Sequence, residues 1–97
     1  MAKIKITGVD EPEYAMEILK KNIRSRLVEI QDQIQDLKEI IQSLERNYGF
    51  GWEEFRKKFE NGELSEECDS DYVEWRAATE ILQELVNEGR VLEDLLD

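Results

Sequence analysis

Few side chains in this sequence could perform chemistry. The chain contains no His, which is the side chain that most often exchanges protons near neutral pH and most often binds metal ions. Its single Cys, Cys68, stands among acidic residues, which disfavour the thiolate and so weaken it as a nucleophile. The sequence also has no nucleophile–base set and no glycine-rich loop. We therefore expect no enzymatic activity, no catalytic residue and no cofactor.

Carboxylates form the densest group of possible metal ligands. They are Glu66, Glu67, Asp69, Asp71 and Glu74. Ca²⁺ and Mg²⁺ bind such oxygens, so a cation site is one interpretation. The ligand spacing and central Gly of an EF-hand are absent, however, and acidic residues also cap a helix and complement its dipole. We favour this second role and expect no metal site.

Two further clusters could bind a ligand or serve only the fold. A basic cluster contains Lys20, Lys21, Arg24 and Arg26. It could hold phosphate, but ion pairs to another helix or to an acidic partner are the simpler interpretation. An aromatic cluster contains Trp52, Phe55, Phe59, Tyr72 and Trp75. It could be an exposed recognition patch, but we favour a small core where helices meet.

Composition excludes several classes of partner. The 97 residues carry 24 acidic and 13 basic side chains, a formal net charge of -11. Phosphate backbones and anionic membrane surfaces are repelled by such a charge, so we expect no nucleic-acid or membrane binding. No apolar run approaches the roughly 18 residues of a membrane span, and the first residues do not resemble a signal peptide. With one Cys and no disulfide partner, a cytoplasmic location is expected.

Apolar spacing predicts one long helix over residues 11–48. Two interleaved sets of residues recur every seven positions and alternate by four and three, which is the seam of a coiled coil. The first set is Met16, Ile23, Ile30, Leu37 and Leu44, and the second is Leu27, Ile34, Ile41 and Tyr48, with Lys20 as the one polar member. A helix about 10 Å wide cannot bury this stripe alone. Another element must lie along it.

Shorter elements complete the predicted fold. Alternating β-branched residues predict a strand over residues 3–9. Gly49 is expected to end the long helix in the left-handed conformation, and a short helix over residues 51–60 follows. A third helix over residues 71–96 is expected, with Glu74 at capping-box distance from Asp71. Ser70 and Asp69 are alternative starting residues for this helix. The single domain of residues 1–97 is thus expected to be all-α, with an additional N-terminal strand.

The two long helices are expected to form an antiparallel hairpin with the short helix at its corner. Placing Leu44 opposite Trp75 aligns apolar positions throughout and sets Ile30 opposite Gly89. Charge supports this direction, because residues 71–97 hold eight acids and two bases and lie beside the basic cluster only when antiparallel. Such exposed pairs are worth only tenths of a kcal/mol each, but they select orientation.

In this register the first helix extends about three turns beyond the end of the third. The strand lies beyond those turns and has no partner strand in the chain, so its backbone groups need another edge. We therefore expect a protein partner, or a second copy, at this end. The expected anchors are Ile4, Ile6, Val9, Tyr14, Ile18 and Leu19.

The corner segment carries a distinctive motif. It comprises Tyr48-Gly49-Phe50, Glu54-Phe55, Phe59, Gly62-Glu63-Leu64, Asp71-Tyr72, Glu74-Trp75 and Ala77. Over residues 45–80 it resembles small bacterial and archaeal antitoxin-type proteins of two-gene toxin–antitoxin modules. The resemblance implies an acidic chain that binds a basic toxin through an extended or helical segment. The chain lacks the helix-turn-helix of DNA-binding antitoxins.

The predicted function is therefore a non-enzymatic protein-binding module, antitoxin-like, that neutralises a small basic toxin. The alternative is a homo-oligomeric coiled coil or a prefoldin-like holding chaperone that self-associates through the strand and the projecting helix.

Overall fold

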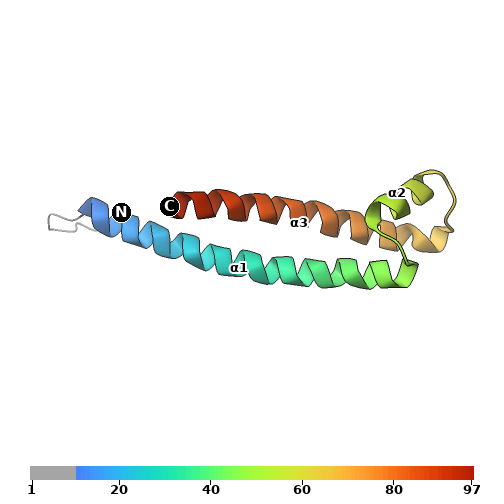
Figure 1. Cartoon of the computed structure of the whole chain (residues 1–97), viewed down its shortest axis with the longest axis horizontal. Coiled ribbons are helices and arrows are strands. Elements are labelled where there is room, and N and C mark those ends of the chain that lie inside the picture. Colours follow the sequence, from blue (N-terminus) through green and yellow to red (C-terminus); the bar gives the residue numbers. More distant parts are fainter. Residues whose placement is uncertain (1–10) are drawn as a thin grey trace, which may run out of the picture.

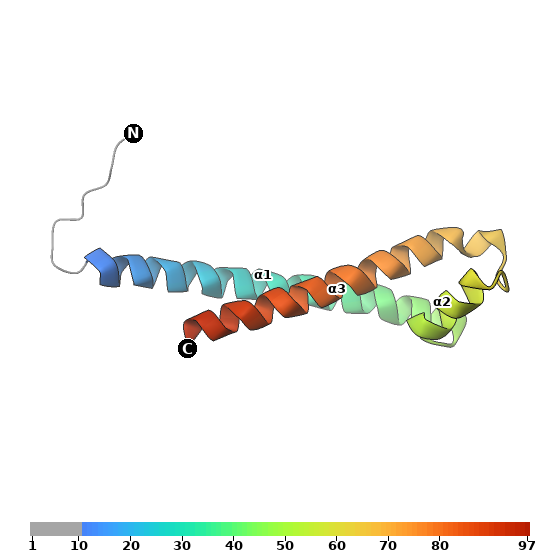
Figure 2. The ribbon, with the colours of Figure 1, turned by 90° about the horizontal axis from the view of Figure 1, so that it is seen from above.

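The fold is a hairpin of two long helices, seen in a computed structural model that describes residues 11–97 (Figure 1). Its elements are α1 (Glu11–Tyr48), α2 (Trp52–Glu60), the 3₁₀ turn η1 (Glu66–Cys68) and α3 (Asp69–Leu96). Figures 1 and 2 show α1 and α3 side by side in opposite directions, with α2 at the end where they are joined. The expected all-α class is confirmed. The strand expected over residues 3–9 lies outside the described residues.

Glycines end the first two helices. Gly49 has a φ of 81° and Gly62 a φ of 73°, conformations that side chains with a Cβ rarely adopt. The Gly49 N–H donates to the Glu45 carbonyl at 2.7 Å, which closes α1. After α2 the Glu63 and Gly62 N–H groups donate to the carbonyls of Lys58 and Phe59, the paired bonds of a Schellman motif. The Gly49 prediction is confirmed.

Of the three starting residues that the sequence offers for the third helix, the structure shows Asp69. The helix begins at Asp69 because η1 continues directly into it, with the Cys68 N–H donating to the Ser65 carbonyl at 3.0 Å. No side chain of the described residues caps this end at Ser65 or Cys68. The capping role predicted for Asp71 is wrong. Its carboxylate instead accepts a hydrogen bond from the Tyr48 hydroxyl at 2.5 Å.

The core lies at the corner of the hairpin. Leu44, Phe55 and Trp75 form its centre, and the last two side chains are fully buried. Phe59 and Tyr72 stack with ring centroids 4.0 Å apart at the edge of this core. The aromatic cluster is therefore a packed core, as the simpler interpretation expects. Within residues 11–97 the buried Trp75 indole N–H has no hydrogen-bond acceptor.

Along the hairpin, the seam pairs in the predicted register. Ile23 and Ile30 on α1 are buried, and a Cβ added to Gly89 on α3 would meet the Ile30 side chain at 3.7 Å. Arg26 donates two hydrogen bonds to the Glu88 carboxylate, at 2.7 and 2.9 Å. This ion pair lowers the pKa of Glu88 and raises that of Arg26, with the hydrogen bond between them as the main cause.

Candidate partner-binding surface

The first turns of α1 project beyond the end of α3. Exposure along the seam rises from 6% at Ile23 to 49% at Met16, and none of the described helices covers the segment before Ile23. We call residues 12–22 the overhang. Figure 1 shows the C-terminal end of α3 stopping short of the beginning of α1. The coiled-coil seam therefore continues past the point where its partner helix ends.

Large apolar side chains are exposed on two faces of the overhang. Met16 and Leu19 lie seven and four residues before the buried Ile23, so they share the face that continues the seam. Tyr14 and Ile18 are four residues apart and share the opposite, outer face. Their exposures range from 44% for Ile18 to 52% for Tyr14. A helix apolar on two sides is typical of a segment buried on two sides.

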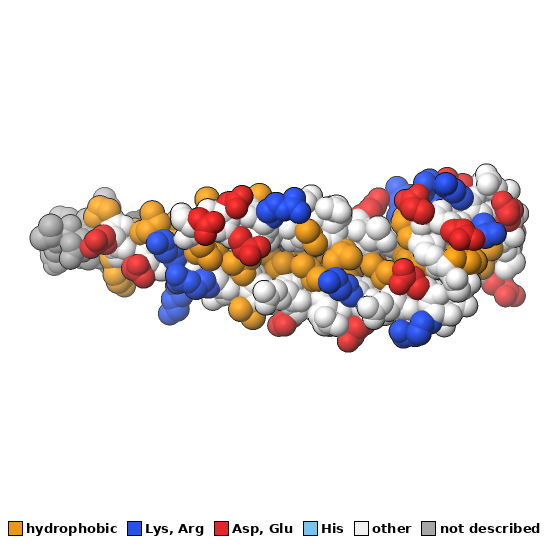
Figure 3. Space-filling model, in the orientation of Figure 1, with side chains coloured by type: hydrophobic (Ala, Val, Ile, Leu, Met, Phe, Trp, Pro, Cys, Tyr) orange, Lys and Arg blue, Asp and Glu red, His pale blue; other side chains and the backbone are white. Residues whose placement is uncertain are grey.

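Charges on the overhang change sign along its length. Glu13 and Glu17 precede Lys20 and Lys21, and Figure 3 shows acidic side chains nearer this tip of the molecule with basic ones next to them. A shallow hollow of about 520 Å³ lies here, lined by Glu13, Tyr14, Met16, Glu17 and Lys20. Both charge signs thus border the exposed apolar side chains.

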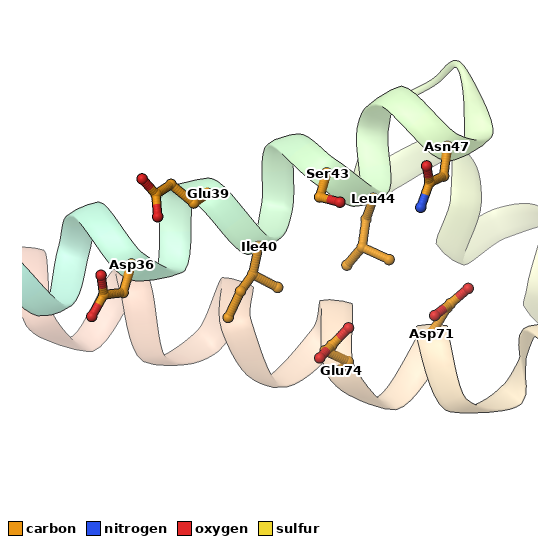
Figure 4. Close-up of a pocket in the computed structure, with 8 residues that line it drawn as sticks. All are labelled: Asp36, Glu39, Ile40, Ser43, Leu44, Asn47, Asp71 and Glu74. Atoms are coloured by element: carbon orange, nitrogen blue, oxygen red, sulfur yellow. The ribbon is translucent and has the colours of Figure 1, made fainter.

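A second surface is the acidic groove between α1 and α3 near the corner. It has a volume of about 520 Å³ and an apolar floor of Ile40 and Leu44. Figure 4 shows carboxylates of both helices along it. They are Asp36, Glu39, Asp71 and Glu74. No Lys or Arg of the described chain lines this groove, so its charge is suited to a cationic group.

The acidic cluster predicted around residue 69 is divided by the fold. Asp71 and Glu74 line the acidic groove, whereas Glu66, Glu67 and Asp69 are exposed and do not line it. In the part of the chain that the structure describes, no three acidic or Cys side chains converge closely enough to hold a metal ion. Cys68 is half-buried and packs against the aromatic core.

The groove partners on α1 were missed by sequence reasoning. Asp36 and Glu39 lie outside the apolar seam, so their pattern alone does not single them out. The signal that could have found them is the register. Placing Leu44 opposite Trp75 brings this stretch of α1 alongside α3, where Asp36 and Glu39 line the same groove as Asp71 and Glu74, which lie closer to the corner.

The predicted anchor residues have different outcomes. Tyr14, Ile18 and Leu19 are exposed on the overhang. Ile4, Ile6 and Val9 lie outside the described residues. Of the basic cluster, Arg26 binds Glu88, whereas Lys20, Lys21 and Arg24 make no ion pair within residues 11–97.

Comparisons of the chain with known proteins found no relative. Among the helices described, none is long and apolar enough to cross a membrane. No family model, curated protein or solved structure matches the chain.

Proposed function

We propose that the chain is a non-enzymatic protein-binding module and that the overhang is its docking surface. The observation that carries this proposal is the exposure of Tyr14, Met16, Ile18 and Leu19 on a helix segment that no described element covers. Fully burying a large exposed apolar side chain is worth about 1.5–3 kcal/mol, and these four are about half exposed, so covering them would contribute about half of that each. Exposed apolar surface of this kind is typical of interaction sites.

The partner that we propose is a small basic protein. The proposed role of this chain is to neutralise that protein in the cytoplasm, as an antitoxin does. The net charge of -11 and the acidic groove support a cationic partner. In this mechanism the overhang anchors the partner through apolar contacts. The acids of the groove take up its Lys and Arg side chains and so cover its nucleic-acid-binding surface. Charge complementarity of this kind chiefly accelerates encounter and suppresses wrong partners.

Co-expression with a small basic protein encoded beside this chain tests the proposal. The readouts are growth of the host and co-purification of the two proteins. We expect the unaltered chain to restore growth and to retain the basic protein on purification. The double variant Tyr14→Ser/Ile18→Ser is expected to lose both effects, because it removes the outer apolar face of the overhang. Asp36→Asn/Glu39→Gln is expected to slow association and to weaken its dependence on salt.

Val28→Ser is the matched control for this experiment. Val28 is 58% exposed on the same helix but lies outside the overhang. It should behave as the unaltered chain does. Growth that is not restored by the unaltered chain, or rescue that survives loss of Tyr14 and Ile18, would contradict the proposed docking surface.

A further inference from the structure

We propose that the seam face of the overhang is covered by the same face of a second copy of this chain. The two copies run antiparallel about a two-fold axis near Ile18. This inference rests on the proposed function, because it names the occupant of one of the two apolar faces of the docking surface. The other face, with Tyr14 and Ile18, stays available for a different protein.

The seam indicates the shape of the missing neighbour. α3 packs antiparallel on α1 as far as Ile23, and the seam continues to Met16 without it. An element that covers Met16 and Leu19 must therefore be a helix lying in line with α3. The overhang of a second copy has the required form, since it carries the same spacing. Pairing near Ile18 sets Met16 against the aliphatic stem of the partner's Lys20, which is itself a seam position.

The order of the charged residues along the overhang favours a second copy of the chain as the neighbour, and an antiparallel direction for it. Glu13, Glu17, Lys20 and Arg24 are spaced by four, three and four residues, so they form one row along the flank of the seam. In an antiparallel pair the acidic half of each row faces the basic half of the other, on both sides of the axis. In a parallel pair this row would face the other flank of its partner, so its opposite charges would not meet. Lys20 and Arg24 make no ion pair among the described residues.

The resulting assembly is an end-to-end dimer. Each overhang occupies the space beyond the partner's α3, and the two corners with their acidic grooves lie at opposite ends. A two-fold interface uses the same patch twice, so each favourable contact is counted twice. The dimer would present two grooves and two outer faces, and so would hold two molecules of a basic protein.

The first test measures the molar mass of the full chain by sedimentation equilibrium over a range of concentrations. We expect a reversible dimer. Met16→Ser/Leu19→Ser should be monomeric, whereas Tyr14→Ser/Ile18→Ser, which removes equally exposed apolar groups from the outer face, should remain dimeric. The overhang lies far from the aromatic core, so near-ultraviolet circular dichroism of Trp52 and Trp75 should be unchanged and shows that each variant is folded.

Charge exchange provides a second, independent test. Glu13→Lys/Glu17→Lys makes the whole row basic, and Lys20→Glu/Arg24→Glu makes it acidic. Each variant alone should dissociate roughly tenfold or more readily than the unaltered chain, because like charges then meet across the axis. Mixed together, the two variants should form a one-to-one heterodimer. The chain with all four exchanges should dimerise again.

Several results would overturn the inference. They are a chain that is monomeric at every concentration, a dimer that persists in Met16→Ser/Leu19→Ser, and charge variants that do not recognise each other. A monomer that still neutralises a basic protein through Tyr14 and Ile18 would refute self-pairing and leave the proposed function intact. A dimer that neutralises no basic protein would support self-pairing and refute the proposed function.

Discussion

Tyr48 links the seam of α1 to the corner core. Its ring meets Phe55 edge-on at a centroid distance of 4.7 Å, and its hydroxyl donates to the Asp71 carboxylate. Burial is the main cause of a strongly raised pKa for the Tyr48 hydroxyl, followed by its hydrogen bond to Asp71. Loss of the proton would remove the donor and place a phenolate against a carboxylate. The folded state therefore favours the protonated side chain.

This shift predicts a loss of stability in alkaline solution. Because the pKa of Tyr48 is higher in the folded than in the unfolded chain, its contribution is complete below pH 10.0 and declines as pH rises above it. Tyr48→Phe should cost about 1 kcal/mol at neutral pH, where it removes one hydrogen bond. The difference between the two chains should shrink above pH 10.0, as urea unfolding at a series of pH values would show. A difference independent of pH would contradict this role of the hydroxyl.

At the scale of the elements, replacing a glycine by alanine is expected to change stability in opposite directions at two positions. Gly89 lies inside α3, and a Cβ there would reach Ile30 at 3.7 Å, an ordinary van der Waals distance. Gly89→Ala should therefore stabilise the protein by about 1 kcal/mol, since Ala is the better helix former. Gly49 has a φ of 81°, so Gly49→Ala should destabilise it by about 1–2 kcal/mol. Thermal unfolding of both variants checks the pair. A destabilising Gly89→Ala would show that α3 packs closer to Ile30 than described.

The helices could be predicted from the sequence where the spacing of apolar residues repeats along the chain. The alternation of four and three over α1 indicates both its length and the face it buries. Matching this face to the apolar stripe of α3, with Leu44 opposite Trp75, then predicts that Ile30 lies opposite Gly89. The beginning of α3 was predictable only to within the three residues from Asp69 to Asp71, because the backbone bond from Cys68 to Ser65 replaces a side-chain cap. The acidic groove was missed for another reason. Asp36 belongs to no apolar stripe, and only the packing of the two helices makes it line one groove together with acids of α3.

At the scale of the whole molecule, the two ends of the hairpin differ in how well they are packed. The described chain measures 67 × 30 × 18 Å and has a radius of gyration of 20.8 Å, against about 12 Å for a compact domain of this length. The fully buried aromatic side chains, Phe55 and Trp75, lie at the corner, which three helices build. At the other end a single helix carries exposed apolar residues. Association at that end would bury the apolar side chains that the monomer leaves exposed there.

The shape of the proposed dimer can be tested by small-angle X-ray scattering. Two hairpins of 67 Å that overlap only through their overhangs, each about 17 Å long, give a particle roughly 115 Å in length. A dimer that paired along the full hairpins would be little longer than one copy. We therefore expect the maximum dimension to rise well above 67 Å with concentration, and to stay near that value in Met16→Ser/Leu19→Ser. A compact dimer of nearly unchanged length would show that the helices pair along their sides rather than end to end.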